Sequence, residues 1–127
     1  MARILYLDDD SSHIALTTRW LNSLGHTTFA FSNAEEALAA FHANPAGFDL
    51  VLTDMSMHGM NGLEFAHQVL TIQPRAKVVI SSGTKDPNWA DFARASGVQN
   101  VILKPGTLEE MTRALDHALA PSSPTND

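Results

Sequence analysis

The feature that most restricts the fold of this chain is a regular alternation of two kinds of segment. Five short runs rich in apolar and β-branched residues are typical of buried strands, and they cover residues 3–7, 27–31, 49–53, 77–81 and 100–103. Five segments with apolar residues at helical spacing follow them in turn: 11–24 (beginning at Ser11 or Ser12), 34–43, 63–72, a segment opened by Asp86 and Pro87 and ended by Gly97, and a last helix capped by Thr107. Parallel strands need crossover connections, and right-handed crossovers put helices on both faces of the sheet. The alternation therefore predicts a doubly wound α/β domain.

Composition restricts the domain further. A length of 127 residues with 44% apolar residues fits one compact domain, expected at 1–120, and the last seven residues (PSSPTND) are expected to form a disordered tail, 121–127. The absence of cysteine excludes disulfides and thiolate metal sites, and a net charge of −6 without a block of Lys or Arg argues against direct nucleic-acid or membrane binding. The first apolar run is too short for a signal peptide or a membrane span, so a cytoplasmic protein is expected.

Acidic residues follow two strands that are neighbours in a doubly wound sheet. Asp8 and Asp9 end the first predicted strand, and Asp54 ends the third. Ligands of such sheets bind beyond the carboxyl ends of the strands, so these carboxylates are expected to converge. Two carboxylates ~4 Å apart repel by roughly 4 kcal/mol at an effective dielectric constant of ~20, so three of them need a cation or must take up protons. An all-oxygen set suits Mg²⁺, while the alternative of simple helix capping remains open, above all for Asp10.

Two more polar residues end predicted strands at the same edge. Ser82 follows the fourth strand and precedes Gly83, and Lys104 follows the fifth and precedes Pro105. A cation and the lysine would neutralise a dianionic group, Ser82 would donate a hydrogen bond to it, and Asp54 would be the nucleophile toward phosphorus. A serine or lysine elsewhere on the surface would carry no such meaning.

At this point the sequence resembles the receiver domain of two-component response regulators, from Arg3 to Leu119. The resemblance rests on four motifs in order: ILYLDDD, DLVLTDMSMHGMNGLEF, VVISSG and VILKP. It implies a flavodoxin-like fold with a five-stranded sheet in the order 2-1-3-4-5 and five helices. It also implies a phosphorylation-dependent switch, which catalyses only its own phosphotransfer and dephosphorylation and is not otherwise an enzyme. The phosphoryl donor would be a histidine kinase or a histidine phosphotransfer protein, and a downstream protein would bind the face of the fourth helix, fifth strand and fifth helix.

The resemblance assigns roles to individual residues. Asp54 would be the phosphoacceptor, Ser82 would bind a phosphoryl oxygen, and Lys104 would form an ion pair with the phosphoryl group and a cis peptide with Pro105. The implied Mg²⁺ ligands are Asp9, Asp54, the backbone carbonyl of Ser56 and, partly through water, Asp8.

Three departures from the family pattern keep alternatives open. His58 replaces a proline in the loop after Asp54, and Val101 stands where the family often has an aromatic switch residue. No output domain follows Leu119 in this sequence, so the chain is expected to be either a single-domain regulator or an excised piece of a larger protein. The main alternative is a degenerate receiver that acts as a phosphorylation-independent interaction module. A less favoured one is a haloacid-dehalogenase-like phosphatase with a nucleophile in the Asp8-x-Asp10 motif, which would leave the Asp54 motif unexplained.

Overall fold

The computed structural model describes residues 2–57, 59–83, 91, 93–98, 100–103 and 108–120. Within these residues, five parallel strands form one sheet in the order β2-β1-β3-β4-β5. The strands are β1 (Arg3–Leu7), β2 (Thr27–Phe31), β3 (Leu50–Asp54), β4 (Val78–Ser82) and β5 (Asn100–Leu103). The predicted fold class and strand order are confirmed.

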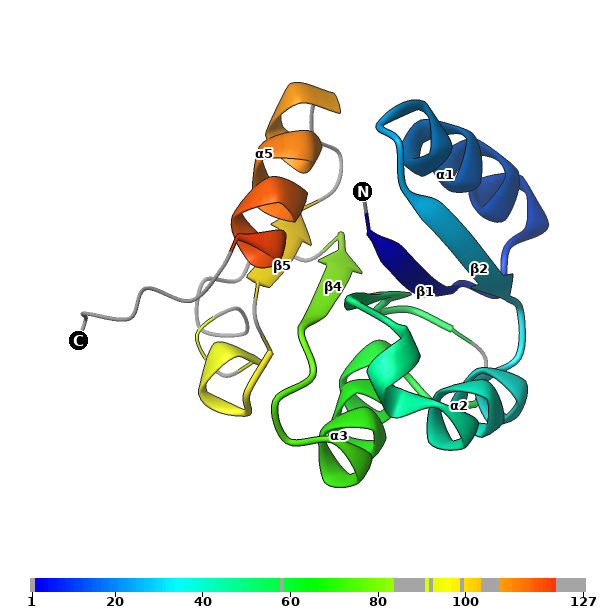
Figure 1. Cartoon of the computed structure of the whole chain (residues 1–127), viewed down its shortest axis with the longest axis vertical. Coiled ribbons are helices and arrows are strands. Elements are labelled where there is room, and N and C mark those ends of the chain that lie inside the picture. The colour runs from blue at the N-terminus through cyan, green and yellow to red at the C-terminus, as the bar shows by residue number, and fades with distance from the viewer. Residues whose placement is uncertain are drawn as a thin grey trace.

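Helices cover both faces of this sheet (Figure 1). Helices α1 (Ser11–Ser23) and α5 (Leu108–Leu119) lie on one face, and α2 (Ala34–Ala43) and α3 (Gly62–Ile72) on the other, with a short 3-10 helix at Pro45–Gly47 before β3. Residues 91 and 93–95 are also helical and belong to the fourth predicted helix. The opening residues Asp86 and Pro87, the predicted cap Thr107 and the tail 121–127 lie outside the described residues. No helix in the described ranges is long and apolar enough to cross a membrane.

The sheet separates two apolar clusters because successive side chains of a strand point to opposite faces. On β1, Leu5 and Leu7 pack toward α2 and α3, whereas Ile4 and Tyr6 pack toward α1 and α5. The largest buried partners on the α2 and α3 side are Phe41, Phe65 and Ile80, and those on the other side are Leu21, Leu50 and Leu115. Strand β1 is therefore buried on both faces, and it pairs with β2 on one side and β3 on the other.

Two predicted strand ranges were wrong by one residue. We expected strands at 49–53 and 77–81, but β3 is Leu50–Asp54 and β4 is Val78–Ser82. Asp49 is exposed, and its carboxylate accepts a hydrogen bond from the backbone N–H of Arg3 at 2.8 Å instead of entering the strand. At the other end, Asp54 pairs with Ser81 of β4. Asp54 is therefore held by the sheet itself and does not belong to the loop that follows.

Candidate functional site

Two buried carboxylates lie together at the carboxyl edge of the sheet. Asp8 follows β1 and Asp54 is the last residue of β3; the register pairs Leu7 with Thr53, so Asp8 and Asp54 come next on adjacent strands. Their exposed fractions are only 2% for Asp8 and 7% for Asp54. Both line a cavity of about 180 Å³, to which α1 and α5 also contribute side chains. The structure thus brings Asp8 and Asp54 together, with the partly exposed Asp9 next in the chain.

Asp8 is held by donors from its own strand and from the following turn. The hydroxyl of Tyr6 donates to Asp8 Oδ2 at 2.8 Å, and the backbone N–H of Asp10 donates to Asp8 Oδ1 at 3.0 Å. His13 Nδ1 lies 3.4 Å from Asp8 Oδ2. The helix cap is Asp10, whose Oδ1 accepts from the N–H groups of Ser12 at 2.8 Å and His13 at 3.2 Å. The capping interpretation is therefore right for Asp10, and Asp8 has a different environment.

Tyr6 is a residue of this site that sequence reasoning missed. Burial raises the pKa of its hydroxyl far above the ordinary value, and the nearby charges of Asp8 and Asp54 raise the pKa further, while the Thr17 side chain acts in the opposite direction. Tyr6 therefore keeps its proton and remains a hydrogen-bond donor. The sequence feature that could have revealed Tyr6 is its position two residues before Asp8, because residues i and i+2 of a strand share a face.

The loop after Asp54 is fitted closely against the backbone of β3. The N–H of Gly62 donates to the carbonyl of Met55 at 2.9 Å, and a Cβ at Gly62 would run into the Asp54 carbonyl oxygen and lie 2.8 Å from Met55 Cα. Helix α3 then begins with a capping box. Asn61 Oδ1 accepts from the Glu64 N–H at 2.8 Å, and Glu64 Oε1 accepts from the Asn61 N–H at 2.9 Å. Glycine and the cap together fix the return of the chain past Asp54.

The remaining predicted site residues are described only in part. Ser82 ends β4 and is buried, with 3% of its surface exposed, and Ser56 is exposed in the loop after β3. Ser81, which sequence reasoning also missed, lines the cavity with Asp8 and Asp54. Lys104, Pro105 and His58 lie outside the described residues, so the ion pair, the cis peptide and the effect of His58 stay predictions.

The donor set fits a hard divalent cation. Among the described residues, no group of three or more His, Cys, Asp or Glu side chains is arranged to hold a metal ion. The predicted Mg²⁺ site needs fewer than three directly ligating side chains. It combines the carboxylates of Asp9 and Asp54 with the backbone carbonyl of Ser56, and Asp8 acts partly through water. Both oxygens of Asp8 already accept hydrogen bonds from the protein, which agrees with an indirect role. Two buried carboxylates on one cavity favour the presence of positive charge, and oxygen-only donors suit Mg²⁺.

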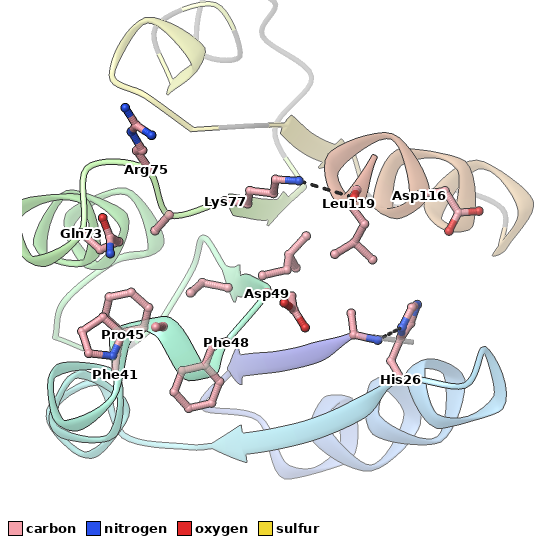
Figure 2. Close-up of a pocket in the computed structure, with 15 residues that line it drawn as sticks. His26, Phe41, Pro45, Phe48, Asp49, Gln73, Arg75, Lys77, Asp116 and Leu119 are labelled. Carbon is pink, nitrogen blue, oxygen red and sulfur yellow. Dashed lines mark hydrogen bonds between the residues drawn. The ribbon is translucent and has the colours of Figure 1, made fainter. Parts of the chain in front are cut away.

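A larger cavity lies at the opposite end of the sheet (Figure 2). Its volume is about 640 Å³, and its lining includes Asp49, Lys77 and Asp116. The ammonium of Lys77 donates to the carbonyl oxygens of Leu119 at 3.4 Å and Ala120 at 3.1 Å, so it stabilises the end of α5. Because doubly wound sheets bind ligands beyond the carboxyl ends of their strands, the smaller cavity between Asp8 and Asp54 is the candidate functional site.

Comparisons with known proteins show which proteins this chain is similar to. The family model described as the response regulator receiver domain matches residues 4–116. The virulence sensor protein BvgS of Bordetella bronchiseptica is 29% identical over 125 residues, which cover 93% of this chain and 10% of BvgS. The transcriptional regulatory protein ZraR of Klebsiella oxytoca is 31% identical over 117 residues, which cover 92% of this chain and 26% of ZraR. The chain thus spans about a tenth of the first relative and a quarter of the second.

A solved structure gives the same result for the fold. The response regulator receiver domain protein from Clostridium thermocellum superposes with a TM-score of 0.86 at 28% sequence identity, and the match covers 94% of both chains.

Proposed function

The chain belongs to the response regulator receiver domain family, and on that premise we propose that it is a phosphorylation-dependent signalling switch whose phosphoacceptor is Asp54. The observation that carries the proposal is the burial of Asp54 at the carboxyl end of β3, on the same cavity as Asp8. A nucleophile in this position is fixed by the sheet and largely shielded from water.

The reaction we propose is a phosphoryl transfer to a carboxylate. An oxygen of Asp54 attacks the phosphorus of a phosphohistidine, an O–P bond forms, the N–P bond breaks, and the leaving imidazole takes up a proton. Asp9, Asp54 and the Ser56 carbonyl would hold Mg²⁺, which when bound supplies positive charge against the negative charge of the phosphoryl oxygens. Ser82 would donate a hydrogen bond to one phosphoryl oxygen, and Lys104 would pair with another.

The partners follow from the family. A histidine kinase or a histidine phosphotransfer protein would donate the phosphoryl group in the cytoplasm. A downstream protein would bind the face formed by the fourth helix, β5 and α5. Inverting a two-state population from 1:99 to 99:1 needs ~5.5 kcal/mol, which charge-assisted contacts to a dianion can supply. Val101 on β5 is buried and has no aromatic ring, so coupling to this face would depend on packing instead of the swing of a ring.

The proposal is tested by the mass of the intact protein after incubation with acetyl phosphate and Mg²⁺. We expect the wild type to gain one phosphoryl group and Asp54→Asn to gain none. Asp91→Asn is the matched control, because Asp91 is an exposed aspartate with 80% of its side chain accessible, and it should behave as the wild type does.

Two other outcomes would contradict this reading. A wild type without an adduct would favour the degenerate interaction module. An adduct that persists in Asp54→Asn but disappears in Asp8→Asn would favour the phosphatase-like chemistry of the first strand.

A further inference from the structure

We propose that Tyr6 is a positioning residue of the acidic site: its buried hydroxyl holds the Asp8 carboxylate in the orientation with which the site binds a divalent cation. The inference rests on the proposed function and deepens it. It concerns a residue of the strand interior, where a side chain without polar atoms would serve the apolar core equally well.

The hydrogen bond between Tyr6 and Asp8 is short and buried, and strand pairing on both sides fixes the backbone of Tyr6. Tyr6 Oη and Asp8 Oδ2 are 2.8 Å apart, and the exposed fractions of the two residues are 3% and 2%. Tyr6 pairs with Ala30 of β2 and with Leu52 of β3, so its backbone is fixed on both sides. The ring packs in the cluster under α1 and α5. The hydroxyl therefore presents its donor to Asp8 from a fixed point.

Two donors determine how the Asp8 carboxylate is turned. The Asp10 N–H binds Oδ1 at 3.0 Å and the Tyr6 hydroxyl binds Oδ2, so rotation of the carboxylate would break one hydrogen bond or both. A carboxylate has about four lone-pair sites, so each oxygen keeps one for water or a cation. Hydrogen bonds of this kind orient the groups around a metal, and their loss typically lowers metal affinity by about 10- to 100-fold.

No other described side chain is placed to replace Tyr6. His13 is the second side chain near Asp8 Oδ2, but it is 3.4 Å away and 51% of its side chain is exposed, so packing restricts its position less than that of the buried Tyr6. The hydroxyl, and not the ring, is thus the group that acts on Asp8.

The first test compares Mg²⁺ affinity by tryptophan fluorescence, since Trp20 lines the same cavity as Asp8 and Asp54. Tyr6→Phe should weaken Mg²⁺ binding by about tenfold or more while the circular dichroism spectrum stays that of the wild type. Thr18→Val is the matched control, because it removes a buried hydroxyl of α1 that has no hydrogen-bond partner among the described residues, and it should leave Mg²⁺ affinity unchanged. Equal affinities for wild type and Tyr6→Phe would overturn the inference.

The second test measures the hydrogen bond of the Tyr6 hydroxyl directly in the wild type. Tyr6 is the only tyrosine of the chain, so its ultraviolet resonance Raman bands report this one hydrogen bond. Mg²⁺ should shift these bands in the wild type and leave them unchanged in Asp8→Asn. If Mg²⁺ did not shift the tyrosine bands of the wild type, the role of Tyr6 would be refuted, even if Tyr6→Phe failed to fold.

These outcomes are separate from those of the phosphorylation assay. A wild type that forms the Asp54 adduct while Tyr6→Phe keeps full Mg²⁺ affinity would refute only the role of Tyr6. A wild type that forms no adduct would refute the proposed function itself.

Discussion

Tyr6 and Thr18 illustrate how differently two buried hydroxyl groups can contribute to a fold. Tyr6 donates to a carboxylate, whereas Thr18 Oγ1 is buried without a hydrogen-bond partner among the described residues. An unsatisfied buried hydroxyl carries a desolvation cost, and replacing it with a methyl group of the same shape removes that cost. We expect Thr18→Val to leave the free energy of unfolding unchanged or to raise it by about 1 kcal/mol, measured by urea denaturation. A loss of more than about 1 kcal/mol would mean that the hydroxyl has a partner after all.

Gly62 is required by a close approach and not by an unusual backbone angle. A Cβ there would collide with the backbone at Asp54 and Met55, which cannot move aside as a flexible side chain could. We expect Gly62→Ala to lower the free energy of unfolding by about 1–3 kcal/mol and to slow formation of the Asp54 adduct. Gly83→Ala is the control, because no atom of the described residues lies within 4 Å of a Cβ at that position. Equal stability of the two variants in urea would contradict the steric argument.

The acidic pair was predictable from the sequence, but the residues that support it were not. An aspartate directly after a buried strand has few structural reasons to be there, so Asp8 and Asp54 stood out. The position of Tyr6 two residues before Asp8 places both side chains on one face of the strand, but the hydrogen bond itself depends on side-chain rotation that the sequence pattern does not encode. Ser81 was missed for a related reason, since the prediction ended its strand at that residue and assigned the role at this edge to Ser82.

At the scale of elements, the predictions succeeded where a local signal marks a boundary. Helix α2 begins at residue 34 as predicted, where Asn33 caps it by accepting from the Glu36 N–H at 3.1 Å, and Gly25 has a positive φ of 91° just after α1. The boundaries of β3 and β4 had no such marker. Both strands are buried on both faces, so no alternation of apolar and polar residues shows where they end.

Helix α3 offers a prediction at this scale, because its start depends on a reciprocal pair of hydrogen bonds. Asn61→Ala removes the side chain that caps the Glu64 N–H, and it should cost about 1 kcal/mol of unfolding free energy. Asn61→Asp keeps an accepting oxygen and should retain the stability of the wild type within about 0.5 kcal/mol, as urea midpoints will measure. If both substitutions cost the same, the cap does not act through its oxygen.

The whole molecule should respond to Mg²⁺ as a single cooperative unit. A ligand that binds only the folded state stabilises it by about 2.7 kcal/mol at a concentration of 100 times its Kd. We therefore expect the Tm of the wild type to rise with Mg²⁺ concentration and the Tm of Asp54→Asn to rise much less, measured by differential scanning calorimetry. Sodium chloride at matched ionic strength separates binding from screening. A Tm that rises equally in both proteins would argue against a cation at Asp54.

The central position of β1 and β3 has a consequence for signalling. Both strands pair on each side and are covered on both faces, so their amide protons should be among the slowest in the molecule to exchange with deuterium. The groups that would receive the phosphoryl signal are thus anchored to the least deformable part of the fold. Any change of shape has to arise where the backbone exchanges faster, so a comparison of deuterium uptake with and without phosphoryl donor would locate the moving segments against an unchanging centre.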